Sequence, residues 1–404
     1  MRFGTPLRAG LAVLASAAAL ASLGWSGHAH AQAREKFQFA ITFPLTGVAA
    51  SQGESANKAV GIAIKEINQS NYLGDMDLEA LFIDSQAKPD IGVRALQQAI
   101  SVNKVNFVIT GYSGVSAAQA PVAERAEVVL VNVGGASPSL SGLSPWFFNA
   151  IPLTHLQIPI LLSEVIDVMG KKNVAIIYRE DDLGKGLRGI FGTMATALGG
   201  KLVAEEAFLP GTNDYRRQLA RIKAANPDMV YIGGVASEVG AVIGQAASLG
   251  LKPLWTSYGA YNHKATIELG GAAAEGGVYT NATTVGADLQ PLASYTALQN
   301  KWKTAFGRVD DMDYVAVQMY MGTYLLADTL KHLRAKGLRL TSKNIRDAMR
   351  TTRYNTANGD MVFDHDQDAI TNIGLFRLDK GEFKAFKIYT PDQVLAANAK
   401  ATKK

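Results

Sequence analysis

The chain has 404 residues, of which 48% are hydrophobic and 19% charged, with 39 glycines and 13 prolines. This composition is typical of a folded chain of roughly two to four domains and excludes disordered and fibrous classes. Cysteine is absent. Its absence excludes disulfide frameworks, thiolate metal sites, cysteine nucleophiles and a lipid-modified N-terminal cysteine.

The charge is weakly positive, with a formal value of +5 and an isoelectric point near 9.1. Lysine and arginine are scattered along the chain, and no basic stripe is interleaved with aromatic residues. Nucleic-acid binding requires such a basic footprint. We therefore expect a solvated surface and no nucleic-acid partner.

The N-terminus has the features of an export signal. Arg2 and Arg8 precede an apolar run over residues 11–23, and Ala29-His30-Ala31 supplies a small-x-small cleavage pattern. The run is too short to span a bilayer, which needs about 20 residues. The sequence predicts a signal peptide over residues 1–31, with cleavage after Ala33 as an alternative, and a mature protein free in a Gram-negative periplasm.

From residue 37 onward, short β-branched or aromatic runs alternate with longer amphipathic stretches. This alternation predicts an α/β fold made of βαβ units around largely parallel sheets. In the first half we expect helices over 54–68 and from Pro89, and strands over 37–43, 78–84, 105–110 and 128–133. After a proline-marked crossing at 149–152 the rhythm restarts, which predicts a second doubly wound half with strands over 174–178, 202–208, 229–232 and 254–257.

The pattern changes after residue 280. Long helices are predicted over 292–306 and 314–336, and a shorter one over 341–349. The turn Asn358-Gly359-Asp360 then leads into two short strands. No low-complexity linker separates the two halves, which favours a hinge between them.

Three patterns resemble catalytic or cofactor sites. Residues 184–189 match the glycines of a dinucleotide-binding turn, but five residues separate the predicted strand from the first glycine. Residues 364–368 resemble the start of a calcium loop, but Ala369 stands where glycine is needed. Residues 111–114 lack the glycine spacing of a nucleophile elbow. We expect no enzyme activity, no cofactor and no metal.

Small and polar residues gather at the carboxyl ends of the predicted strands, where open α/β sheets bind ligands. Each segment alone is compatible with a tight βα turn, and their coincidence at one edge of both halves favours a binding cleft. The segments are residues 44–47, 111–114, 133–138, 233–235 and 256–259.

The order of several motifs resembles the periplasmic leucine/isoleucine/valine-binding proteins that serve ABC importers. The resemblance extends over essentially the whole mature chain. Its motifs are Phe43-Pro44-Leu45-Thr46-Gly47, Gly53, residues 61–68, 84–89, Gly111-Tyr112-Ser113-Gly114-Val115, 120–123, 182–186, Asn213-Asp214-Tyr215 and Phe363-Asp364.

The resemblance implies a type I periplasmic-binding-protein fold, with two doubly wound α/β lobes joined by a three-crossing hinge. The crossings are expected near residues 149–151, 279–283 and 362–365. Lobe 1 would comprise 32–150 plus 281–363, and lobe 2 would comprise 151–280 plus 364–404. Ligand binding would close the hinge of a monomer, and the membrane permease subunits of the importer would recognise the closed form.

The family's ligand contacts carry over only in part. Ser113 matches the serine that holds the ligand carboxylate, and Gly134 matches the residue whose carbonyl helps to hold the ammonium. A neighbouring threonine of the family falls on Ala136. The acid that pairs with the ammonium falls on Tyr258, so this pairing is missing.

The remaining family positions are apolar or aromatic. Three family tyrosines fall on Gln52, Leu183 and Val235, and Tyr314 keeps an aromatic residue near the cleft rim. With Tyr112 and Tyr258, these residues would form an apolar, partly aromatic wall with hydroxyl donors. An alternative is that Leu183 and Val235 only pack beneath the loops.

The sequence thus predicts a periplasmic solute-binding subunit of an ABC importer of the branched-chain amino acid type. Its ligand would be a small hydrophobic carboxylate, such as an aromatic or keto acid, or a related amide. A branched-chain or neutral amino acid is the alternative ligand, and a ligand sensor of a regulatory system is the alternative of another class. Arg179 could supply a cation, or Asp181 and Asp182 could neutralise it.

Overall fold

The computed structural model describes residue 1 and residues 34–309 and 312–402. The chain divides into two units, residues 1–35 and residues 36–404. Apart from Met1, the predicted signal peptide lies outside the described residues, and so do Ala31 and Ala33, after which cleavage is expected. Among the described helices, none is long and apolar enough to cross a bilayer.

The first sheet has five strands in the order β2-β1-β3-β4-β5, and β1, β3, β4 and β5 pair in parallel. Alternate residues of its strands are buried on opposite faces: Phe39 and Ile41 lie in one apolar cluster and Ala40 lies in another. Burial on both faces is typical of parallel sheets covered by helices. The strands are β1 (Glu35–Phe43), β2 (Met76–Asp84), β3 (Phe107–Thr110), β4 (Val129–Asn132) and β5 (Phe147–Asn149).

The second sheet has seven strands in the order β15-β14-β10-β9-β8-β6-β7. Its parallel part, β7-β6-β8-β9-β10, repeats the strand order of the first sheet, and the antiparallel pair β14 and β15 extends one edge. The strands are β6 (Asn173–Arg179), β7 (Lys201–Phe208), β8 (Met229–Gly233), β9 (Leu254–Ser257), β10 (Val278–Ala282), β14 (Ile373–Asp379) and β15 (Glu382–Tyr389).

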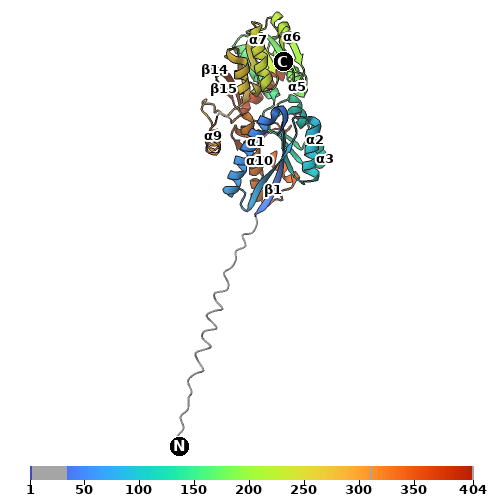
Figure 1. The fold of residues 1–404 in the computed structure, drawn as a ribbon, viewed down its shortest axis with the longest axis vertical. Helices are drawn as coiled ribbons and strands as arrows, with labels where there is room; N and C mark the ends of the chain where they lie inside the picture. Colours follow the sequence, from blue (N-terminus) through green and yellow to red (C-terminus); the bar gives the residue numbers. More distant parts are fainter. Residues whose placement is uncertain (2–33, 310–311, 403–404) are drawn as a thin grey trace. The chain divides into compact units, whose positions relative to one another are not determined.

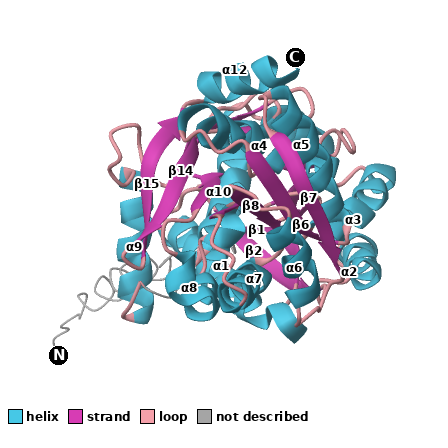
Figure 2. Ribbon diagram, turned by 90° about the horizontal axis from the view of Figure 1, so that it is seen from above, coloured by secondary structure: helices cyan, strands magenta, loops and turns pink. Residues whose placement is uncertain are grey.

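Helices cover both faces of each sheet. On the first sheet, α1 (Ala50–Gln69), α9 (Ala293–Phe306) and α10 (Tyr314–Ala335) pack on one face, with α11 (Ser342–Met349) beside them. The opposite face carries α2 (Pro89–Ser101) and α3 (Ser113–Ala126) (Figure 1). On the second sheet, α4 (Thr154–Ser163), α5 (Asp182–Ala197) and α12 (Pro391–Thr402) share one face (Figure 2). The other face carries α6 (Arg216–Ala224) and α7 (Ala236–Ser248), with α8 (Lys264–Gly270) against α7.

The chain passes between the two sheets three times: after β5, after β10 and before β14. A small antiparallel sheet, β11 (Tyr354–Thr356), β12 (Gly359–Phe363) and β13 (Ala369–Ile370), precedes the last passage. Here Asn149 forms a parallel bridge with Asp368, and the Asn149 Nδ2 donates to Asp368 Oδ1 over 2.8 Å. The two-sheet α/β architecture is confirmed, while the expected lobe boundaries stay a prediction.

Most expected elements are present within a few residues of their predicted bounds. The strands β5, β10, β14 and β15 and the helix α12 were not predicted individually. The turn at 358–360 lies inside the β11–β12 hairpin, with one strand before it and one after it. Residues 364–368 form a compact turn in which Asp364 Oδ1 accepts from the backbone N–H groups of Asp366 and Asp368, both over 2.9 Å.

Candidate ligand-binding site

Each sheet has a point at which its strand order reverses. In the first sheet this point lies between β1 and β3, and in the second it lies between β6 and β8. Loops that leave the carboxyl ends of neighbouring strands diverge at such a point, which makes it the usual ligand site of open α/β sheets. We call these the first and the second switch point.

Ser113 lies at the first switch point as the first residue of α3. Its Oγ accepts a hydrogen bond from the backbone N–H of Ser137 over 3.2 Å. Within the described residues, no acceptor is found for the Ser113 hydroxyl hydrogen. Because the first-turn N–H groups of a helix lack partners and favour negative charge, the start of α3 suits a carboxylate.

Asn132 holds the loop beside Ser113. Its Oδ1 accepts from the N–H groups of Gly134 over 3.2 Å and Gly135 over 2.7 Å. A Cβ at Gly135 would lie 2.9 Å from the Ser113 nitrogen, so glycine allows the close approach. Gly134 is exposed and its backbone is accessible to a ligand. Sequence reasoning did not single out Asn132, whose only signal is an amide at the end of an apolar strand.

Tyr112 joins two βα units at the first switch point. Its hydroxyl donates to Oε1 of Gln52 in α1, and its ring lies 5.7 Å from the ring of Phe43 at the end of β1. Burial raises the pKa of the Tyr112 phenol. The backbone φ of Tyr112 is +69°, an uncommon value for a non-glycine residue that is frequent at binding sites.

Four other predicted residues belong to one apolar cluster in the second half. Ala136 and Leu183 are 8% exposed and lie in its buried core, and Val235 and Tyr258 pack against it. The carbonyl of Ala136 accepts from the N–H and the hydroxyl of Thr154, over 3.1 and 2.8 Å. Ala136 and Leu183 are therefore more deeply buried than the half-buried Val235 and Tyr258. Both expectations for Leu183 and Val235, contact with a ligand and packing beneath the loops, stay predictions.

Tyr258 follows β9, and its hydroxyl donates to the carbonyl of Gly234 over 3.0 Å. Burial raises the pKa of Tyr258, and the charge of Glu238 raises it further. The phenol of Tyr314 also raises the pKa of Tyr258. Tyr314 begins α10, which packs on the first sheet.

Arg179, at the end of β6, pairs with two carboxylates. Its Nε donates to Oδ2 of Asp181, and its Nη1 donates to Oε1 of Glu238 over 3.2 Å. Asp182 instead accepts the Ser137 hydroxyl on its backbone carbonyl, over 2.9 Å. The open question about Arg179 is thus answered: it is neutralised, by Asp181 and by an acid that sequence reasoning missed.

Glu238 is the missed acid, and it is 7% exposed. It lies in the first turn of α7, where its Oε2 accepts from the N–H of Val235 over 2.9 Å. Burial raises the pKa of Glu238, while the charge of Arg179 opposes this shift. A glutamate three residues after a loop that precedes an apolar helix is the signal that could have found it.

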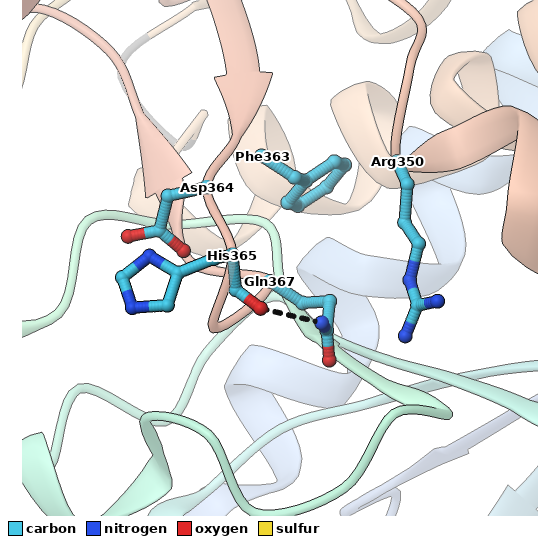
Figure 3. A pocket seen from close by; sticks show the side chains of 5 residues that line it. All are labelled: Arg350, Phe363, Asp364, His365 and Gln367. Atoms are coloured by element: carbon cyan, nitrogen blue, oxygen red, sulfur yellow. Dashed lines mark hydrogen bonds between the residues drawn. The ribbon is translucent and has the colours of Figure 1, made fainter.

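Two surface hollows are lined by other residues. One, of about 470 Å³, is lined by Arg350, Phe363, Asp364, His365 and Gln367 (Figure 3), and the Gln367 Nε2 donates to the His365 carbonyl over 2.9 Å. The other, of about 350 Å³, lies along β7 and the start of α6 and includes Glu180. None of the nine predicted ligand contacts lines either hollow. The described residues hold no group of three potential metal ligands.

The sequence and the fold can now be compared with known proteins. A sequence model of the periplasmic binding protein family matches residues 36–382. This chain belongs to that family. The resemblance to leucine/isoleucine/valine-binding proteins is also confirmed: Leu/Ile/Val-binding protein homolog 3 of Brucella melitensis is 26% identical over 275 residues, which cover 67% of this chain and 73% of that protein.

Two solved structures share the fold of this periplasmic binding protein. A leucine-binding protein from Thermotoga maritima has a TM-score of 0.78 at 24% identity, covering 88% of this chain and 99% of that chain. A solute-binding protein of an ABC transporter from Rhodopseudomonas palustris, in complex with 3,4-dihydroxybenzoic acid, has a TM-score of 0.77 at 23% identity, covering 88% and 98%. The type I binding-protein fold is therefore confirmed.

Proposed function

We propose that this periplasmic binding protein captures a small carboxylate with an aromatic or other apolar tail and delivers it to an ABC importer. It acts by binding and release, without catalysis or a cofactor. Its predicted signal peptide would place it in the periplasm, where the membrane permease subunits are its partners. The kinship with a solute-binding protein that holds a dihydroxybenzoic acid supports this ligand class.

The observation that carries the proposal is that a serine stands at position 113 while a tyrosine, and not an acid, stands at position 258. The Ser113 hydroxyl at the start of α3 can donate to a carboxylate. Tyr258, by contrast, presents a phenol already bonded to the Gly234 carbonyl, where an amino-acid ligand would need an acid. Burying an ammonium without a carboxylate costs several kcal/mol, so a ligand without an α-ammonium fits this site better.

Hinge closure is the proposed mechanism of capture. The Ser137–Asp182 hydrogen bond already joins a loop of the first sheet to α5 of the second. A ligand that touches Ser113 on one side and Tyr258 on the other would bind best when the halves are closed. It would shift the equilibrium by the difference between its affinities for the two states.

The second candidate ligand is a branched-chain or neutral amino acid. It is favoured by the relatives named for leucine, isoleucine and valine binding. In that case a group other than Tyr258 must balance the ammonium. Asp313 could do so: it caps α10, accepts from the Ala316 N–H over 2.9 Å, and its charge acts on the Tyr112 phenol.

Thermal unfolding of refolded, ligand-stripped protein tests the proposal. The panel would contain benzoate, 4-hydroxybenzoate, phenylpyruvate, 4-methyl-2-oxopentanoate, short amides, leucine and phenylalanine. A ligand at a thousandfold excess over its dissociation constant stabilises the folded protein by about 4 kcal/mol. We expect aromatic or keto acids to raise the unfolding midpoint. A shift with amino acids alone would contradict the proposal.

A further inference from the structure

Arg179 is the feature of the site that the proposed function leaves unexplained. Its side chain is 23% exposed and lies between Asp181 and Glu238 at the second switch point. Two carboxylates thus surround one guanidinium, in a place where a binding protein would be expected to keep its charged groups for the ligand. The charge of Arg179 also acts on the phenols of Tyr112 and Tyr258, so it lies within electrostatic range of both halves.

Glu238 lies directly behind the predicted ligand wall. One carboxylate oxygen accepts from the Val235 N–H, and a Cβ at Gly234 would lie 2.8 Å from that oxygen. The carbonyl of Gly234 in turn accepts the hydroxyl of Tyr258. Glu238 is therefore the carboxylate whose charge acts most strongly on the Tyr258 phenol.

An α-ammonium placed beside Tyr258 would need one of these two acids. Both already pair with Arg179, and Glu238 is buried, so an ammonium would have to displace a guanidinium that is covalently part of the protein. An internal partner has a large entropic advantage over a ligand, because it loses little freedom on pairing. The guanidinium also repels a second positive charge at short range.

We infer that Arg179 is a built-in cation that determines specificity: it occupies Glu238 and Asp181 and thereby excludes ligands with an α-ammonium. This inference rests on the proposed function and deepens it. The first switch point selects for a carboxylate, and the second selects against an ammonium. Keto and aromatic acids meet both conditions, and amino acids meet only the first.

Pairs of ligands that differ only at the α-carbon measure the effect of the ammonium on affinity. Phenylpyruvate and phenylalanine share a ring and a carboxylate and differ at the α-carbon, as do 4-methyl-2-oxopentanoate and leucine. Titration calorimetry on ligand-stripped protein would compare wild type with Arg179→Gln and Arg179→Lys. The control is Arg188→Gln, because Arg188 forms a 2.7 Å ion pair with Glu205 in the same half, with a half-exposed side chain.

We expect wild type to bind each keto acid at least about tenfold more tightly than the matching amino acid. This is the usual effect when a charged group of a ligand, here the ammonium, is left without a charged partner. Arg179→Gln frees Glu238 and should move that ratio at least about tenfold toward the amino acid. Arg179→Lys and Arg188→Gln should keep the wild-type preference. The double variant Arg179→Gln/Glu238→Gln should lose the part of the gain that Glu238 supplies and keep only the part from the freed Asp181.

A second variant covers the case in which Arg179→Gln does not fold, since it leaves Glu238 buried without its partner. Glu238→Gln removes one of the two carboxylates around Arg179 and makes the cluster less negative, so phenylpyruvate should bind more tightly and phenylalanine should not. If keto acids bind wild type but their ratio to amino acids is the same in Arg179→Gln, the inference is wrong and the proposed function stands. If wild type binds no carboxylate at all, the proposed function itself is wrong.

Discussion

At both switch points a helix glycine packs against a backbone carbonyl oxygen of the preceding loop or strand end, but the two points differ in the charge of their side chains. At the first, Gly53 of α1 packs so closely on the loop after β1 that a Cβ would lie 2.2 Å from the Pro44 carbonyl oxygen. At the second, a Cβ at Gly184 of α5 would lie 1.8 Å from the Arg179 carbonyl oxygen. The first presents the neutral side chains of Gln52, Tyr112 and Ser113, and the second presents an ion-pair cluster.

Under the proposed function, the two switch points divide the recognition of one small ligand between them. The neutral switch point keeps a hydroxyl donor and helix N–H groups available, which favours an anion. The charged switch point has its donors and acceptors paired within the protein. Substitutions that have the same effect at both switch points would contradict this division, and substitutions with different effects would support it.

The largest expected effect lies at the junction between the two halves. Asp368 is fully buried and accepts from Ser141 Oγ over 2.5 Å and Asn149 Nδ2 over 2.8 Å. Burial raises the pKa of Asp368 to about 6, against about 3.9 for an exposed aspartate. The native state therefore binds this proton more tightly than the unfolded chain, and the resulting stabilisation is complete below about pH 3.9 and is lost as the pH rises through about 6.

Urea unfolding of wild type and Asp368→Asn from pH 4.5 to 7.5 measures this effect. Over this range wild type should gain about 2 kcal/mol of unfolding free energy relative to the variant as the pH falls, toward a limit of about 3 kcal/mol at lower pH. Burial lowers the pKa of the neighbouring His155, whose Nε2 lies 3.6 Å from Asp368 Oδ2, and acts in the opposite direction. A difference that stays constant with pH would contradict the assignment.

Glycine substitutions compare the close contacts between helix and backbone carbonyl in the two halves. Gly184→Ala and Gly53→Ala should each lower the unfolding free energy by about 2 to 3 kcal/mol, because the new Cβ overlaps a carbonyl oxygen. The controls Gly189→Ala and Gly61→Ala, on the same two helices with open space around the glycine, should raise it by about 0.5 to 1 kcal/mol. Chemical denaturation provides the measurement. An unfolding free energy that Gly184→Ala leaves unchanged would show that the backbone contact there is unimportant.

Removal of the carboxylate donor affects only the first switch point. Ser113→Ala should weaken binding of phenylpyruvate or 4-hydroxybenzoate by about 1.5 to 3 kcal/mol, or roughly 10- to 100-fold, the usual value of a hydrogen bond to a charged group. The exposed Ser139, in the neighbouring loop, supplies the control Ser139→Ala. Calorimetry that gave equal affinities for both variants would exclude Ser113 as the carboxylate contact.

The smallest effect compares ion pairs within the second half. Glu238→Gln leaves the Arg179 guanidinium with one charged partner in a buried place and should cost about 1 to 2 kcal/mol of stability. Glu205→Gln breaks the more exposed pair with Arg188 and should cost less than about 0.5 kcal/mol. Equal unfolding midpoints of the two variants would show that the Arg179–Glu238 pair contributes no more to stability than an exposed ion pair.

Much of the fold follows from the sequence, because buried parallel strands are near-continuous apolar runs separated by amphipathic helices. The strands β1 and β6 and the long helix α10 are examples of such clear patterns. The strand β5 has only three residues, and β15 alternates exposed and half-buried residues at a sheet edge. Such strands are defined by pairing with distant partners, which local periodicity does not encode.

The positions of Ser113 and Tyr112 were predictable, because both follow the apolar strand β3 closely in sequence. Their role in ligand binding stays a prediction. A contact between residues that only the fold brings together was not predictable. Arg179 and Glu238 are 59 residues apart in sequence, and nothing local indicates that β6 and α7 place them in contact. The sequence therefore left the charge of Arg179 open, and the structure assigns its partners.

The central claim is that the ligand carries a carboxylate and no α-ammonium. Its most direct test is the ratio of the dissociation constants of ligand-stripped wild-type protein for phenylalanine and phenylpyruvate, measured by calorimetry in one buffer. The account predicts that phenylpyruvate binds more tightly, by about tenfold or more. Tighter binding of phenylalanine would contradict it, and would point to Asp313 or another acid as the partner of the ammonium.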